Sequence, residues 1–374
     1  MRLTALLTLL FAVSALRVSA QTSVNPDFSV IGDFRAFSHN DRARPRAGED
    51  ISLADPQMEL DVSGYLNPYM RAALALGWHG EERAEIEEVY LTILRGLPLG
   101  ANFRAGRYLL EFGRLNPVHE HAWSFLNRPL AHEVFFGDEG LADMAFRVSF
   151  LLPTGDVYTE LMIAGLKGDA LLDEDERAAI SDGADENRPG FFGRLATSLA
   201  VGETSELALG VSALNSVYNS LDSQRIGVIL IPAGRVRAWV GGLDIKYRHA
   251  PSRYRTLQIE AEALFRSDAH TVIERASSFA GYGYIDYRFS GQYNLGGVLE
   301  YLSHETFTPP SSSILGTVES STWRTGLFVG FSPVEETSVF RLAGHWTNPE
   351  NAGGFWEAQF QIVIGLGPHK THNF

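Results

Sequence analysis

The stretch "GGFWEAQFQIVIGLG", residues 353–367, alternates between apolar and polar side chains. Its apolar positions are Trp356, Ala358, Phe360, Ile362, Ile364 and Leu366, and the positions between them begin with Glu357, Gln359 and Gln361. A period of two residues is that of a β-strand with one apolar and one polar face. The stretch therefore predicts a strand over 355–367, and the fold depends on what its apolar face contacts.

The same alternation recurs along the whole chain and predicts sixteen strands. They are expected at 27–38, 52–64, 69–79, 84–94, 99–110, 140–152, 156–166, 190–201, 205–215, 235–249, 253–267, 275–289, 292–303, 320–331, 337–347 and 355–367. Strands of globular proteins usually have about five or six residues. A tilted strand that crosses a bilayer needs about 9 to 11, which fits these segments better.

The predicted connections alternate between tight turns and long loops. Tight turns are expected at 67–68, 153–155 and 290–291, and long loops at 111–139 and 167–189. Short turns at one end, long loops at the other and an even strand number are typical of outer-membrane barrels. We therefore expect an all-β fold, a porin-like transmembrane antiparallel up-and-down β-barrel over residues 21–367. The alternative is a soluble β-protein that buries its apolar faces in a dry core.

The aromatic residues distinguish these alternatives. Five of the six tryptophans, all except Trp123, fall on the apolar parity of their strands at the long-loop end, and Tyr247, Phe289 and Tyr293 share that parity at the opposite end. Bilayer interfaces favour such amphipathic rings at both boundaries, whereas a soluble sandwich gives no reason to sort them. The pattern favours lipid as the contact of the apolar face.

Composition limits the remaining classes of protein. Residues 1–20 have the basic start, apolar run and small residues of a secretory signal peptide. The formal charge of −14 argues against a nucleic-acid partner, and the absence of cysteine excludes disulfides and thiolate sites. No esterase elbow, His-Glu-x-x-His motif or phosphate loop occurs, so the sequence does not indicate an enzyme.

If the apolar parity faces lipid, the other parity faces the lumen. The residues expected to line the pore are Arg147, Arg194, Asp244, Lys246, Arg248, Glu260, Glu262, Asp286, Arg288 and Arg324. We expect the arginines and Lys246 to form a basic strip that faces Glu260, Glu262 and Asp286 across a hydrated bore. The alternative is that these charges pair between neighbouring strands and only hold the wall together.

The segment 111–139 is unusually aromatic for a loop in water. We expect it to be an inward-folded loop of the barrel domain. Its residues His119, Glu120, His121, Trp123 and His132 are expected to form a constriction. The imidazoles of His119, His121 and His132 are ligands that suit zinc, and so predict a metal site. The alternative is that these histidines make ordinary polar contacts.

Three stretches resemble a family of bacterial outer-membrane, porin-like proteins often labelled zinc-regulated TonB-dependent outer-membrane receptors. They are "NPDFSVIGDF" at 25–34, "EEVYLTILRGLPLGANFRAGRYLLEFGRLNPVHEHAWSFLNRPL" at 87–130 and "GPHKTHNF" at 367–374. The resemblance implies an outer-membrane location and a link to zinc supply. TonB-dependent receptors have 22 strands and an N-terminal plug domain, whereas about sixteen strands are expected here.

The sequence thus predicts a channel in a Gram-negative outer membrane for small hydrophilic solutes or ions, surrounded by lipid and lipopolysaccharide. Residues 368–374 are expected to form a periplasmic tail, and both a monomer and a homo-oligomer remain open. The rival hypotheses are a non-conducting receptor that binds a metal or a partner, and a structural or adhesive barrel.

Overall fold

A computed structural model describes residues 26–42, 44, 48, 51–80, 83–137, 139–168, 170–171, 188–220, 224–226, 229–231, 234–270, 275–307, 317–334 and 337–368. The predicted signal peptide, most of the acidic 167–189 loop and nearly all of the predicted tail lie outside these residues. No helix among the described residues is long and apolar enough to cross a membrane.

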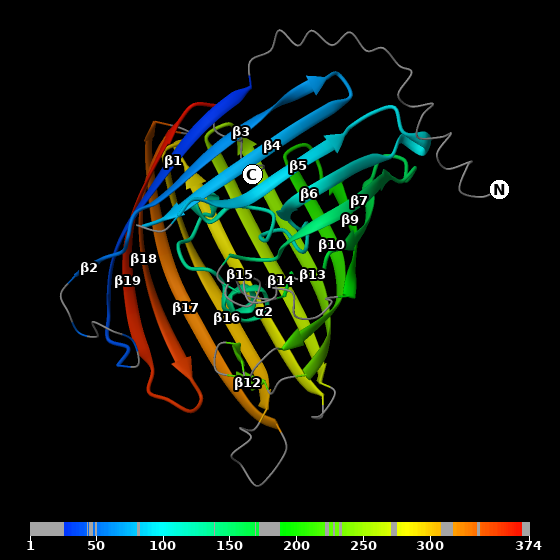
Figure 1. Ribbon diagram of the computed structural model, residues 1–374. Helices are drawn as coiled ribbons and strands as arrows, with labels where there is room; N and C mark the ends of the chain where they lie inside the picture. Colours follow the sequence, from blue (N-terminus) through cyan, green and yellow to red (C-terminus); the bar gives the residue numbers. More distant parts are fainter. Residues whose placement is uncertain are drawn as a thin grey trace.

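The described chain forms one closed antiparallel sheet (Figure 1). Its sixteen long strands are β1 Asp27–His39, β3 Gln57–Asn67, β4 Met70–His79, β5 Glu85–Ile93, β6 Asn102–Leu109, β7 Ala142–Leu151, β8 Tyr158–Leu166, β9 Arg188–Ala200, β10 Ser205–Ser220, β13 Gly234–Ser252, β14 Arg255–His270, β15 Ala276–Phe289, β16 Tyr293–Phe307, β17 Thr317–Val334, β18 Ser338–Pro349 and β19 Phe355–Leu366. Each pairs with its neighbours in sequence, and β1 pairs with both β3 and β19. The sheet therefore has no free edge, which a hydrocarbon environment requires.

The structure confirms the predicted all-β barrel of about sixteen strands, with differences at the strand ends. The second predicted strand, 52–64, is divided into a two-residue β2, Ser52–Leu53, and β3. Pro56 lies between them, and proline cannot donate a ladder hydrogen bond. Two other strands are longer than expected, since β13 has 19 residues and β17 has 18.

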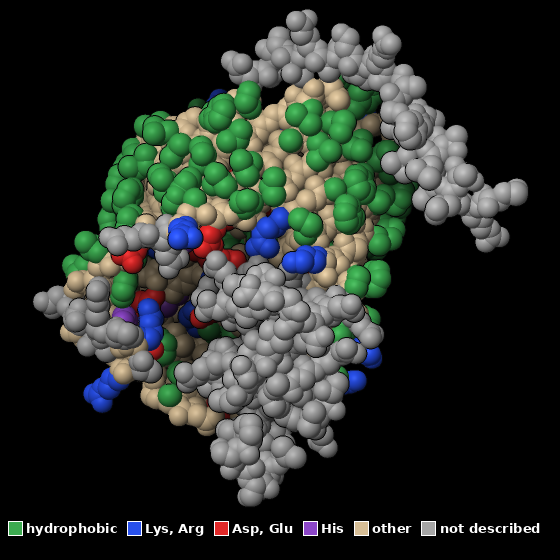
Figure 2. Space-filling model, viewed as in Figure 1, with side chains coloured by type: hydrophobic (Ala, Val, Ile, Leu, Met, Phe, Trp, Pro, Cys, Tyr) green, Lys and Arg blue, Asp and Glu red, His purple; other side chains and the backbone are tan. Residues whose placement is uncertain are grey.

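The outer surface of the barrel is apolar. Large hydrophobic side chains alternate outward along the strands, and they gather in a broad band in Figure 2. At the short-turn end, rings of neighbouring strands stack in a row, with Tyr293 and Phe331 centroids 4.8 Å apart. At the other end Trp323 lies 4.5 Å from Tyr301, and Trp323 is 50% exposed. The two rows match the aromatic girdles of membrane barrels.

Substitution of Leu327 tests whether the apolar outer surface contacts lipid. Leu327 lies between Trp323 and Phe331 on β17 and is 74% exposed, which places it near the middle of the apolar band. We expect Leu327→Arg to lower the free energy of unfolding in lipid vesicles by about 2–4 kcal/mol, because a cation at the bilayer midplane is poorly solvated. The same change at Leu99, 88% exposed in a short turn, should cost much less. Equal effects in urea titrations would argue against a lipid-facing band.

Candidate functional site: the lumen segment and an acidic pocket

The segment between β6 and β7, residues 110–141, lies inside the barrel with its short helix α2, Leu130–Phe136 (Figure 1). We refer to it as the lumen segment. Its two ends are joined, since the Leu110 amide donates to the Leu141 carbonyl at 2.9 Å. The side chain of Asn116 donates to the carbonyls of both residues and accepts from the Leu141 amide at 2.8 Å. The segment is therefore a closed loop whose base is fixed by one asparagine.

The lumen segment brings its own apolar core into the barrel. Phe112, Trp123, Phe125 and Phe135 are at most 3% exposed. Phe125 packs against Tyr284 on the inner face of β15, with ring centroids 5.1 Å apart. The loop is aromatic because its rings are buried against the wall, and burial of such rings supplies much of the packing energy of a core.

Glu262 of β14 is a central attachment point for this segment. One of its carboxylate oxygens accepts the backbone N–H groups of Arg114 and Leu115, and the other lies 3.1 Å from Nε2 of His132. Gly113, with φ +63°, lies directly against this carboxylate, and a Cβ at that position would meet it at 2.4 Å. A glycine is therefore required where the chain approaches Glu262.

Other wall charges also hold the lumen segment. Asp244 makes a two-oxygen pair with Arg194 at 2.6 and 3.1 Å, and Arg114 approaches it to 2.7 Å. Further attachments join Ser124 to Asp286, the Leu130 amide to Glu300, Arg324 to the Arg128 carbonyl, Arg266 to the Phe135 carbonyl, and Arg147 to Glu111.

The residues predicted to line the pore therefore face inward, but most of them are buried. Arg147, Arg194, Asp244, Glu260, Glu262, Asp286 and Arg324 are at most 8% exposed, while Lys246, Arg248 and Arg288 are partly buried. Arg147, Arg194 and Arg324 are paired with carboxylates, and the expected water-facing basic strip stays a prediction. Sequence parity gave the inward direction of these side chains but not the packing of the lumen segment against them.

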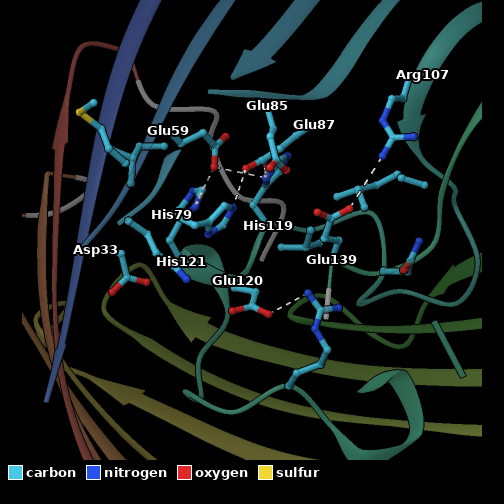
Figure 3. Close-up of a pocket in the computed structure, with 18 residues that line it drawn as sticks. Asp33, Glu59, His79, Glu85, Glu87, Arg107, His119, Glu120, His121 and Glu139 are labelled. Carbon is cyan, nitrogen blue, oxygen red and sulfur yellow. Dashed lines mark ion pairs between the residues drawn. The ribbon is translucent and has the colours of Figure 1, made fainter. Parts of the chain in front are cut away.

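A pocket of about 310 Å³ lies between the lumen segment and the inner faces of β1 and β3–β6 (Figure 3). Its titratable lining consists of six carboxylates, three histidines and two arginines: Asp33, Glu59, Glu85, Glu87, Glu120, Glu139, His79, His119, His121, Arg107 and Arg128. Acidic and purple-coloured histidine side chains are visible within the hollow in Figure 2. The lining favours a positively charged ligand.

His119 lies at the centre of this acidic group. Its Nδ1 is 3.3 Å from one oxygen of Glu59 and 3.3 Å from one oxygen of Glu87, and its Nε2 is 3.6 Å from Glu88. His121 Nδ1 is also 3.3 Å from Glu59. Burial by itself disfavours the charged imidazole, yet the surrounding carboxylates raise the pKa of His119 well above its ordinary value.

The structure does not bring His132 to this pocket. Its side chain is fully buried against Glu262, Phe136 and Tyr282 and is not part of the pocket lining. Of the residues expected at the constriction, His119, Glu120 and His121 line the pocket, while Trp123 is buried with Phe125. Of the three expected metal ligands, only His119 and His121 lie together, with centroids 5.8 Å apart.

Sequence reasoning missed Glu87 because of a β-bulge. Ala75 pairs with Glu88 and Leu76 with Ile86, so Glu87 is an extra residue in β5. Ile86 and Val89 point outward, and Glu87 can therefore turn inward beside Glu88. Two adjacent acids in an otherwise alternating strand were the signal for this irregularity.

Comparison with known proteins gives the fold and leaves the activity open. No family model matches the chain. An uncharacterized protein of Aquifex aeolicus is 30% identical over 241 residues, which are 60% of this chain and 47% of that protein, so the chain spans about half the length of this relative.

Several solved structures are similar in fold at low identity. They include a trimer form of the outer membrane protein OmpT of Vibrio cholerae (TM-score 0.58, 8% identity, 91% of this chain and 99% of that one) and an anion-selective porin from Comamonas acidovorans (0.56, 9%, 91% and 98%). The outer membrane channel DcaP of Acinetobacter baumannii is similar with a TM-score of 0.53 and 12% identity over 93% of this chain and 99% of that chain. The likenesses support a porin-like barrel and give no support to the zinc-regulated, TonB-dependent label. The chain thus has the fold of outer-membrane porins.

Proposed function

We propose that this protein is an outer-membrane channel for small hydrophilic cations, narrowed by the lumen segment. The observation that carries the proposal is the attachment of an aromatic loop, through charged wall residues, inside a barrel with an apolar outer surface. A barrel of sixteen strands is wide enough for an aqueous channel when its interior is not filled. Here, the lumen segment sets how much of that width remains.

The acidic pocket supports the cation preference. Six carboxylates line the space between the lumen segment and the inner faces of β1 and β3–β6, against two arginines and three histidines. Rings and clusters of acidic side chains select cations in channels, because the field they create attracts positive charge and repels negative charge. Among these carboxylates, the side chains of Glu87 and Glu139 are 27% and 37% exposed, so they contact the solvent in the pocket.

Current through planar bilayers tests this function. We expect the purified protein in a potassium chloride gradient to give a reversal potential with the sign of a cation-selective pore. Neutralising two pocket carboxylates, Glu85→Gln with Glu139→Gln, should shift that potential toward zero, because the cation-attracting field is weaker. Asp156→Asn, in an exposed short turn, is the matched control and should leave it unchanged. A reversal potential with the anion sign in the unmodified protein would contradict the proposal.

A non-conducting receptor is the second candidate, and the buried aromatic core of the lumen segment favours it. Phe112, Phe125 and Phe135 leave little room where they pack. If the lumen is closed, the pocket would bind a ligand without letting it pass through the barrel. The same bilayer recordings separate the two functions. A receptor gives no steady current from verified inserted protein, whereas the proposed channel gives a small persistent one.

A further inference from the structure

We propose that Glu59, Glu87, His119 and His121 form a binding site for one divalent transition-metal ion, with Zn²⁺ as the matching probe. The proposal goes beyond conduction, because a metal can bind whether or not solutes pass the lumen. Imidazole and carboxylate together are a donor set that suits zinc. This set replaces the His119, His121 and His132 combination expected from the sequence.

The donor atoms of Glu59, Glu87 and His119 lie close enough together for one shared ion, and His121 lies beside Glu59. Glu59, Glu87 and His119 each offer an atom within 4.8 Å of the other two. The two contacts of His119 Nδ1 and the contact of His121 Nδ1 with Glu59 are all 3.3 Å. Two atoms that each lie about 2.1 Å from zinc at a tetrahedral angle are about 3.4 Å apart. Small side-chain movements would therefore complete the site.

One buried atom of this group lacks a hydrogen-bond partner among the described residues. It is Oε1 of Glu59, the carboxylate whose other oxygen faces both histidines, and Glu59 is only 8% exposed. A buried polar atom without a partner costs free energy, and its presence in a native structure requires an explanation. A metal ligated by both oxygens of the Glu59 carboxylate would provide one.

The surroundings fix the ligands in place. Glu120, between the two histidines, is held by Arg35 at 3.3 Å and by Arg128 at 2.7 Å, and so cannot compete for the same ion. Arg341 donates to the His121 carbonyl at 3.0 Å. Such outer contacts orient metal ligands and are needed for affinity.

Gly77 provides the space for Glu87. On β4 it lies opposite Glu59 of β3, and a Cβ at residue 77 would meet Oε1 of Glu87 at 1.9 Å. The β-bulge turns Glu87 inward, and the missing side chain of Gly77 lets it reach toward Glu59. The side chains of Glu87 and His79 are 27% and 43% exposed, so an ion can reach the group from solvent.

Calorimetric titration of the full-length protein in detergent with Zn²⁺ tests the site. We expect one ion per chain, and a loss of affinity of roughly tenfold or more for Glu59→Gln and for His119→Gln. Because these two side chains are buried, their replacement can disturb folding. Glu87→Gln is therefore added as a third variant, since the Glu87 side chain is partly exposed. Far-UV circular dichroism verifies the barrel in each case.

Two controls distinguish this site from general attraction of cations. Glu139→Gln removes another carboxylate of the same pocket, and the double variant His369→Gln with His372→Gln removes the histidines of the C-terminal residues. Both should bind Zn²⁺ within about twofold of the unmodified protein. The proposal is overturned if the unmodified protein shows no binding at about 100 µM Zn²⁺, a concentration high enough to reveal a site with a dissociation constant in the micromolar range. It is also overturned if folded Glu87→Gln and either buried variant keep full affinity. Loss of current with intact Zn²⁺ binding would reject only the channel.

Discussion

Replacement of residues 111–140 by an Asn-Gly turn is expected to raise the single-channel conductance more than tenfold. Leu109 pairs with Ala142 in the β6–β7 ladder, and the Leu110 amide donates to the Leu141 carbonyl. A two-residue turn can therefore close the hairpin without moving either strand. The aromatic core of the lumen segment is removed, and a sixteen-stranded barrel without it should hold an aqueous channel.

The wall charges explain why the shortened protein should still fold. Glu262, Asp244 and Glu300 lose their contacts with the segment, but water can then solvate them. The ladder that closes the barrel is unchanged, because residues 111–140 contribute no strand. The matched control shortens a loop that does not enter this core, the 350–354 connection. If both variants conduct like the unmodified protein, the lumen segment is not the constriction.

Asp244→Asn is expected to lower the free energy of unfolding by about 3–5 kcal/mol, the usual cost of removing one partner of a buried ion pair. The Asp244 side chain is 1% exposed, and it pairs with Arg194, which is 5% exposed, and with Arg114. Asparagine has the same shape but no charge. The two guanidinium groups would remain close together without their shared anion.

Urea titration of protein in lipid vesicles, followed by tryptophan fluorescence, measures this loss. Asp156→Asn carries the same chemical change at an exposed turn and should alter stability by no more than about 0.5 kcal/mol. A loss below 1 kcal/mol for Asp244→Asn would mean that water reaches Arg194 and that this part of the lumen is hydrated. That result would support the basic strip expected from the sequence alone.

The barrel could be predicted from local pattern because the period of a strand is a local property. In β19, Trp356, Phe360, Ile364 and Leu366 are exposed, as the alternation of the opening stretch predicts. Lipid on one side and a lumen on the other impose the same alternation on every strand. The bulge at Glu87 interrupts this alternation, so the inward direction of that pocket residue could not be predicted from the pattern.

The sequence by itself determined the number of strands, which of their side chains point into or out of the barrel, and the unusual aromatic content of residues 111–139. Only the tertiary structure decided which residues meet inside, because a loop can approach any part of a cylinder that it enters. Thus His119 lies beside Glu59, 60 positions earlier, while His132 lies beside Glu262, 130 positions later. These pairings depend on barrel closure and on the path of the lumen segment, and neither is encoded in the spacing of the histidines.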